Sequence, residues 1–270
     1  MLSVYCYQYD LYNSVWMKQL SKKTYTSKDF VDKYYTAQKI DVFHQYEDKP
    51  AMHKMVGDVK GKTVLCIGCG NGDECEYIMK KGAMRVVGID LSKSMIKTAQ
   101  SRHKDIEFHV MSAAKLSFKS GEFDMLYSDL VFHYMSNRIP AMEEAYRVLK
   151  PGGRFIFSEI HPIYDMLERI NHNNTRLSIF GYIKKNGKYK MFGSYFGRKV
   201  RSSEWFKGHI VRSYAETFSS IIMPAIRSGF IIKSIEEPKP LKSLKKYDAE
   251  HYKKLSAIPQ ALILELAKPG

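Results

Sequence analysis

The chain has 270 residues, of which 44% are hydrophobic, so it can bury a core and is not compositionally disordered. No apolar run is long enough to span a bilayer, and the first 20 residues lack the pattern of a secretory signal, which predicts a cytoplasmic protein without a membrane segment. The net charge of +15 would suit an anionic partner.

The first 60 residues are polar and have a helical pattern. Ser27 can cap a helix that begins near Lys28, and Pro50 precedes a second short helix over residues 51–56. We therefore expect an N-terminal helical cap over residues 1–60, followed by a main domain over residues 61–270.

From Lys62 onward, short apolar runs alternate with helical patterns. Strands are predicted over residues 63–67, 85–89, 106–110, 123–128 and 154–159, and helices over residues 73–81, 92–103 and 139–149. Ser92 is a plausible N-cap, and Pro151-Gly152-Gly153 ends the last helix. Strands separated by helices of this length predict a parallel sheet with helices on both faces.

The alternation stops after Pro162. Residues 163–212 are rich in aromatic and basic side chains, and Asn186-Gly187 between strand-like flanks predicts a hairpin. A helix over 213–228 and two strands over 230–236 and 261–267, joined by a lysine-rich connection, follow. We expect residues 163–212 to form an insertion over the edge of the sheet where the active site lies.

A glycine-rich turn follows the first strand, in the sequence VLCIGCGNGD of residues 64–73. Glycines at alternate positions allow a sharp turn against which a ligand can lie, and the next helix begins with free N–H groups. Asp90 ends the second strand, where an acid can bind both hydroxyls of a ribose. The dinucleotide-binding fingerprint G-x-G-x-x-G/A requires a small residue at position 73, whereas this chain has Asp73 there, which argues against a dinucleotide.

Three of the four cysteines, Cys66, Cys69 and Cys75, form the pattern C-x-x-C-x5-C. A zinc site would need a fourth ligand and a suitable loop, whereas the segment is explained as a buried strand and a ligand-binding turn. We interpret the cysteines as unpaired small hydrophobic residues and predict no metal.

Several segments together resemble the class I S-adenosylmethionine-dependent methyltransferases. The match covers roughly residues 60–162: the turn and second strand resemble motifs I and II, and MSAAKLSF, FDMLYSDLVFHYM and LKPGGRFIFSEIHP resemble later segments of that family. The closest subgroup is the small-molecule type of ubiquinone and menaquinone biosynthesis. The resemblance implies an α/β fold: a Rossmann-like, seven-stranded, mostly parallel sheet with helices on both faces, an N-terminal helical cap and a lid insertion after strand five.

The resemblance also implies S-adenosylmethionine as the cofactor, with S-adenosylhomocysteine as its product. Roles then fall on matching residues: the methionine part on the glycine turn, the ribose on Asp90, the adenine on the segments that follow the second and third strands, and the sulfonium near the end of the fourth. The implied cofactor-binding residues are Gly68, Cys69, Gly70, Asp73, Asp90, Leu91, Met95, Ser112, Ala113, Ala114, Ser128 and Asp129.

Two positions depart from the family pattern. Family members usually have an acid where this chain has Cys66, and often Asp where it has Ser112. A hydroxyl can still accept a hydrogen bond from adenine, and a neighbouring acid such as Asp129 can act at the amino end of the cofactor. A partner subunit that binds the cofactor without turnover remains an alternative.

Methyl transfer from a sulfonium is an in-line displacement, and a general base is needed only where the acceptor must lose a proton. His133 and His161 follow the fourth and fifth strands, at the edge where ligands bind in open α/β sheets. Either one is a candidate to orient or deprotonate the acceptor, or each is a structural histidine. Tyr34, Tyr35 and Trp205 are candidates to contact the substrate, or to pack within the cap and the insertion.

Ten of the basic residues and one acid, Glu204, lie within residues 175–212, mixed with aromatic side chains. Cations can bind carboxylate or phosphate, and aromatics can stack on a planar group. The favoured acceptor is an anionic small molecule, for which an aromatic ring is one option. The alternatives are RNA and a basic surface without a ligand. Residues 128–135, SDLVFHYM, lack the signature of enzymes that methylate exocyclic base amines. The oligomeric state cannot be inferred.

Overall fold

The structure is a computed structural model that describes residues 7–8, 28–172, 175–196, 199–206 and 209–270. Ser27, the expected helix cap, lies outside the described residues. Helix α2 (Lys28–Ile40) begins at the next residue, as expected. A short π-helix, η1 (His44–Asp48), then continues directly into helix α3 (Lys49–Val56).

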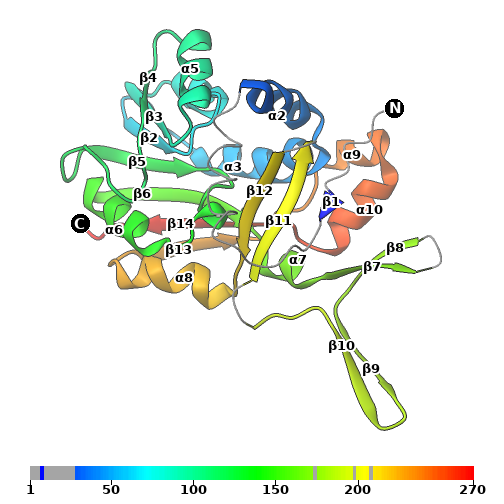
Figure 1. The fold of residues 1–270 in the computed structure, drawn as a ribbon. Helices are drawn as coiled ribbons and strands as arrows, with labels where there is room; N and C mark the ends of the chain where they lie inside the picture. Colours follow the sequence, from blue (N-terminus) through cyan, green and yellow to red (C-terminus); the bar gives the residue numbers. More distant parts are fainter. Residues whose placement is uncertain (1–6, 9–27, 173–174, 197–198, 207–208) are drawn as a thin grey trace.

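A seven-stranded sheet forms the centre of the fold, in the order β13-β14-β6-β5-β2-β3-β4 (Figure 1). Six strands run in one direction, and β14 is antiparallel to both of its neighbours. The strands are β2 (Thr63–Ile67), β3 (Arg85–Asp90), β4 (Glu107–Val110), β5 (Phe123–Ser128), β6 (Leu149–Ile160), β13 (Ile231–Glu236) and β14 (Ala261–Ala267). The predicted mostly parallel α/β sheet is confirmed.

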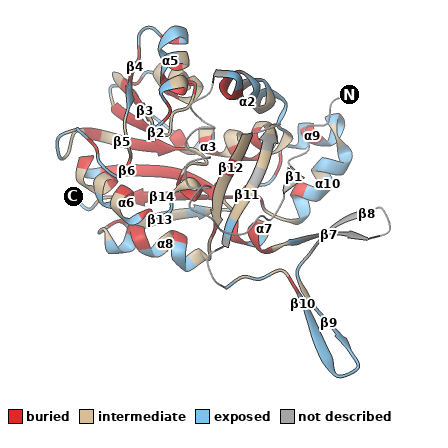
Figure 2. Ribbon diagram, in the orientation of Figure 1, coloured by how far each residue is buried: buried red, intermediate tan, exposed pale blue. Residues whose placement is uncertain are grey.

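Helices cover both faces of this sheet, and the side chains of β2 alternate between them. Val64 and Cys66 pack toward α3, α4 (Asp73–Lys80) and α5 (Lys93–Arg102). Leu65 and Ile67 pack toward α6 (Ile139–Val148) and α8 (Phe218–Arg227). Every residue of β2 is buried, which places the turn after it on a rigid support (Figure 2).

Local signals account for several boundaries. The Ser92 hydroxyl accepts a hydrogen bond from the Met95 amide at 3.1 Å, so Ser92 is the N-cap of α5 as predicted. Asn186 and Gly187 have φ values of 51° and 74°, which suit the two-residue turn between β9 (Gly181–Lys185) and β10 (Lys188–Phe192).

Two sequence predictions were wrong in detail, and one connection holds helices that the sequence analysis did not predict. Strand β6 begins at Leu149 rather than at 154, because the backbone of Gly152 and Gly153 pairs with Lys268 beyond β14. The helix predicted over 213–228 begins only at Phe218, because β12 (His209–Ala215) pairs with β11 (Lys199–Phe206) through Ala215. The lysine-rich connection contains two helices, α9 (Lys242–Tyr247) and α10 (Ala249–Ala257).

The segment after β6 divides into parts that lie in different places. A short helix, α7 (Pro162–Met166), leads to the pair β7 (Glu168–His172) and β8 (Thr175–Ile179) and then to the hairpin β9–β10, which projects away from the body (Figure 1). Strands β11 and β12 return to pair with β1 (Tyr7–Gln8) and to pack against α2, where Val211 and Phe206 contact Phe30.

A buried ion-pair network joins the strand β6 to the segments around it. The Arg138 guanidinium contacts Glu159 of β6 and Glu216 at 3.0 Å each, and its side chain is 4% exposed. His133 Nδ1 lies 3.7 Å from Glu159. In the described part of the chain, no helix is long and apolar enough to cross a membrane.

We expect Arg138→Met to lower the free energy of unfolding by about 3–5 kcal/mol, because it leaves the buried Glu159 without its cation. Arg85→Met is the control: Arg85 also contacts two acids, Glu107 and Glu122, but at the surface, where such pairs are worth about 0–1 kcal/mol. Chemical denaturation measures both losses. Equal losses would contradict this account of the network.

Candidate active site

The turn after β2 is shaped by left-handed backbone at Gly68 and Gly70, with φ values of 68° and 52°. A Cβ on Gly68 would lie 2.4 Å from a methyl carbon of Val131, so only glycine fits there. A Cβ on Gly70 would meet no atom within 4 Å. The turn is therefore packed against the protein at Gly68, whereas the space beside Gly70 is open and can receive a ligand.

Asp90, the last residue of β3, braces this turn. Its Oδ2 accepts a hydrogen bond from the Gly70 amide at 3.1 Å, and its Oδ1 accepts from the Ser92 amide at 2.8 Å. Burial raises the pKa of Asp90 in spite of these two bonds. Leu91 follows with its side chain 63% exposed, an apolar surface beside the acid that a planar ligand can cover.

The segment 111–115 lies beside Asp90, whose carbonyl accepts from the Met111 amide at 3.0 Å. The Ser112 hydroxyl accepts from the Ala114 amide at 3.3 Å, and Ala113 is buried. Of the residues that were expected around an adenine, Met95 differs most, because it packs under α2 against Phe30, Val31 and Val211.

A cavity of about 320 Å³ opens directly beside the turn. Its wall comes from α2, the π-helix η1 and α3 on one side, and from the ends of β2 and β5 and the start of α4 on the other. The lining residues are Tyr34, Lys39, His44, Gln45, Lys49, Cys66, Ile67, Gly68, Cys69, Gly70, Asn71, Asp73, Glu74, Tyr127, Asp129 and Leu130.

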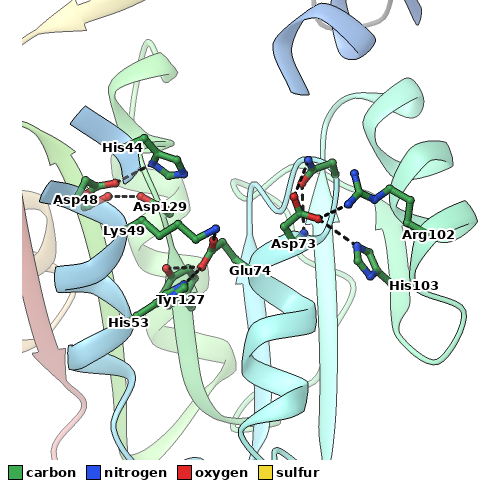
Figure 3. Close-up of polar contacts among 12 residues, drawn as sticks. His44, Asp48, Lys49, His53, Asp73, Glu74, Arg102, His103, Tyr127 and Asp129 are labelled. Atoms are coloured by element: carbon green, nitrogen blue, oxygen red, sulfur yellow. Dashed lines mark hydrogen bonds and ion pairs between the residues drawn. The ribbon is translucent and has the colours of Figure 1, made fainter. Parts of the chain in front are cut away.

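Glu74, in the first turn of α4, is held by partners on three sides (Figure 3). Its carboxylate contacts Lys49 Nζ at 2.8 Å and His53 Nε2 at 2.6 Å, and it accepts from the Tyr127 hydroxyl at 3.2 Å. Although burial opposes ionisation, the hydrogen bond from His53 and the charge of Lys49 lower the pKa of Glu74 to about 2. The charge of Glu74 is thus neutralised within the protein.

A second group of polar side chains contains His44, Asp48 and Asp129 (Figure 3). Each offers one atom that could coordinate a metal ion, and these three atoms lie within 4.8 Å of one another. His44 Nδ1 is 3.4 Å from Asp48 Oδ2, and the Ser158 hydroxyl donates to Asp129 Oδ1 at 2.7 Å. Burial, reinforced by the charge of Asp48, raises the pKa of Asp129 well above its usual value.

On the other side of the turn, Asp73 accepts hydrogen bonds from the Asn71 side chain at 3.1 Å and from Arg102 at 2.8 Å (Figure 3). The predicted unpaired cysteines are free: Cys66 and Cys75 are buried, and burial raises the pKa of the Cys75 thiol well above its usual value.

The structure does not bring His133 or His161 into the wall of the cavity. His133 is buried against Glu159, with its ring 4.0 Å from that of Tyr134. His161 is fully buried: its Nε2 bonds Glu237 at 2.8 Å, and its Nδ1 accepts from the Ile163 amide as the cap of α7. Burial lowers the pKa of His161 in spite of Glu237.

Among the other predicted residues, Tyr34 and Asp129 line the cavity. Ser128 precedes Asp129, but its buried hydroxyl lacks a partner among the described residues and does not line the cavity. Tyr35 and Trp205 lie in α2 and β11, and their side chains fall outside the described residues. Sequence reasoning missed Lys39, His44 and Lys49, because nothing local marks which side of the cap helices faces the turn. It also missed Glu74 in the first turn of α4, whose partners Lys49 and His53 come from the cap.

Comparison with known proteins shows that part of this chain is similar to methyltransferases. Residues 65–157 match the model of a methyltransferase domain. An S-adenosylmethionine-dependent methyltransferase from Mesorhizobium loti is 28% identical, with a TM-score of 0.65 over 80% of this chain and 95% of that one. A demethylmenaquinone methyltransferase from Lactococcus lactis is 26% identical, but the match spans only 57% of this chain and 60% of that enzyme.

A third comparison shows the fold alone. The 1,6-didemethyltoxoflavin-N1-methyltransferase of Burkholderia thailandensis, solved with 1,6-didemethyltoxoflavin and S-adenosylhomocysteine, is 14% identical, with a TM-score of 0.57 over 98% of this chain and 95% of that one.

A pair of glycine variants tests whether a ligand lies on the turn. Gly70→Ala and Gly121→Ala both place a Cβ on left-handed backbone with no atom closer than 3.9 Å, so each should cost about 1–2 kcal/mol of stability. We expect only Gly70→Ala to weaken the binding of S-adenosylhomocysteine, by about tenfold or more. Calorimetry and thermal unfolding measure the two effects. Equal binding by both variants would place the ligand elsewhere.

Proposed function

We propose that this chain, in which residues 65–157 form a class I S-adenosylmethionine-dependent methyltransferase domain, transfers the methyl group of S-adenosylmethionine to a small-molecule acceptor. The observation that carries the proposal is the cavity between the glycine turn and the N-terminal helices. Its volume of about 320 Å³ falls in the range of small-molecule sites.

The residues around the cavity fit the cofactor. The open side of Gly70 leaves room for the methionine part, and each oxygen of Asp90 bonds one backbone amide and retains lone pairs for the ribose hydroxyls. The exposed Leu91 offers an apolar surface to the adenine, and the Ser112 hydroxyl can accept from its amino group. We propose these roles as the family resemblance implies them.

The cofactor, when bound, supplies an activated methyl group on a sulfonium, so the protein mainly has to orient the acceptor and exclude water. Tyr34, Lys39 and His44 form the wall that faces the turn. A tyrosine ring can stack on a planar acceptor, and a lysine can bind its carboxylate or other anionic group. We therefore propose an anionic acceptor with an aromatic ring.

Names of related proteins point in the same direction. The Lactococcus relative is named for demethylmenaquinone, and the Burkholderia structure holds 1,6-didemethyltoxoflavin. The basic hairpin β9–β10 favours a second candidate, RNA, because Tyr182 and Tyr189 are exposed there beside Lys184 and Lys188. That hairpin projects away from the body and contributes nothing to the lining of the cavity, which supports the small molecule (Figure 2).

A comparison of aromatic acids with their neutral methyl esters tests the acceptor class. We expect S-adenosylhomocysteine to form with the acids, and Lys39→Met to raise KM for them by about tenfold while the affinity for S-adenosylhomocysteine stays unchanged. Lys33→Met, on the same helix but paired with Asp29, is the matched control. Equal turnover of acids and esters would contradict an anionic acceptor.

The role predicted for His133 or His161 in deprotonating the acceptor remains a prediction, to be dropped if both alanine variants fold and keep wild-type turnover. The RNA alternative predicts binding at about 50 mM salt that weakens steeply as salt rises, because phosphate contacts release counterions. Absence of RNA binding at that salt would remove it. Binding of the cofactor without turnover of any acceptor would favour the partner-subunit alternative.

A further inference from the structure

The departure at Cys66 leaves the cavity without the acid that the family places at the end of this strand. Cys66 lines the cavity as a buried thiol. The cofactor's methionine end carries an α-ammonium group, which requires hydrogen-bond acceptors and favours negative charge. Another part of the wall must therefore supply them.

Two carboxyl groups lie against one another at that wall (Figure 3): Asp129 lines the cavity, and Asp48 is buried directly behind it. Asp48 is 0% exposed, and neither of its oxygens has a hydrogen-bond donor in good geometry among the described residues. Asp129 follows β5 directly and lines the cavity together with Gly68 and Cys69. The pair thus combines buried acceptors that lack donors with a position beside the glycine turn.

The imidazole of His44 and the hydroxyl of Ser158 compensate this pair only in part. His44 Nδ1 is 3.4 Å from Asp48. Lys49 is bound to Glu74 at 2.8 Å, and Glu47 turns away to accept from the amides of Gln260 and Ala261 at 3.1 and 3.4 Å. Ser158, from β6, contributes one hydroxyl donor, which bonds Asp129.

When two buried carboxyl groups are in contact, the charge of one opposes ionisation of the other, and the pKa of at least one of them rises. Burial raises the pKa of Asp48 to about 6, and burial together with Asp48 raises the pKa of Asp129 well above its usual value. The pair therefore favours keeping one shared proton in the free protein, and it titrates as a unit.

We propose that Asp48 and Asp129 together bind the α-ammonium group of the cofactor, in place of the carboxylate that Cys66 lacks, and that the ammonium group displaces their shared proton. The inference rests on the proposed function. The balance is simple: the ammonium donates its N–H bonds to the two carboxylates, and one proton leaves to the solvent. Glu74 is unsuited to this role, because Lys49, His53 and Tyr127 already occupy its oxygens.

The proposal predicts the direction in which the affinity for S-adenosylhomocysteine changes with pH. Because a proton on the pair competes with the ammonium group, the affinity for S-adenosylhomocysteine must fall as the pH falls from about 8 to about 5.5. Several charged and titratable groups face the pair, so variants of Asp48 are needed to assign the effect. These groups are His44, Glu47, Lys49, Glu74, Tyr34 and Tyr127.

Isothermal titration of S-adenosylhomocysteine in buffers with different ionisation enthalpies, near pH 7, counts the protons released. We expect the wild-type protein to release about one proton and Asp48→Asn to release none. The variant should also bind S-adenosylhomocysteine about 10- to 100-fold more weakly, because it loses one charge-assisted hydrogen bond to the ammonium group. Asp105→Asn, an exposed acid outside the cavity, is the matched control and should behave as wild type. Melting temperatures establish that each variant folds.

Two analogues separate the ammonium group from the rest of the ligand. Deamino-S-adenosylhomocysteine lacks only that group, and methylthioadenosine lacks the whole amino-acid end. We expect wild-type protein to prefer S-adenosylhomocysteine over the deamino analogue, and Asp48→Asn to lose most of that preference.

Other results would overturn the inference. Tight binding of S-adenosylhomocysteine without proton release, with Asp48→Asn unchanged, would overturn it and leave the proposed function standing. Binding of Mn²⁺ by EDTA-treated wild-type protein but not by Asp48→Asn, with the cofactor then requiring the metal, would assign the pair to a metal instead. Failure of both S-adenosylhomocysteine and methylthioadenosine to bind would overturn the inference and the proposed function together.

Discussion

The electrostatic balance of the carboxyl groups at one edge of the sheet governs this site. Four acidic side chains lie near the glycine turn, and the carboxyl group of each has different partners. Asp90 bonds two backbone amides, Asp73 bonds Arg102, and Glu74 bonds Lys49 and His53. Asp129 faces Asp48, another acid, and this pair is left to be balanced by a proton or by the ligand.

The cap that supplies Asp48 is fixed from several directions, which a binding pair requires. Arg154 of β6 donates to the carbonyl groups of Met55 and Val56 at the end of α3. Glu47 accepts from two amides at the start of β14, although burial raises its pKa to about 7. The Leu241 amide bonds the carbonyl of Tyr46 at 2.7 Å. The π-helical turn is therefore anchored to the sheet on both sides of Asp48.

Much of the fold could be predicted from the sequence, because local patterns determine it. The buried runs at 63–67, 123–128 and 261–267 became strands with those boundaries, and Ser92 caps its helix through its own hydroxyl. The prediction was wrong at 213–215, where pairing with β11 overrides the helical pattern of the sequence.

The site was predictable only where one segment forms it. The turn, Asp90 and Asp129 could be found from motifs, since each lies at or directly after the end of a strand, at the same edge of the sheet. His44, Asp48 and Lys49 carry no motif. Contacts with distant parts of the chain position their segment: Lys49 pairs with Glu74, and the adjacent Glu47 accepts from the amides of Gln260 and Ala261. His133 and His161 follow the correct strands, but Glu159 and Glu237 hold their rings away from the wall.

The central claim is that this chain binds the amino end of its cofactor with acids from the cap and from β5. A crystal structure with S-adenosylhomocysteine bound tests it most directly. The account predicts the ribose hydroxyls at Asp90 and the α-ammonium nitrogen within hydrogen-bond distance of both Asp48 and Asp129. An ammonium nitrogen that contacts neither carboxylate, or a metal ion between them, would contradict it.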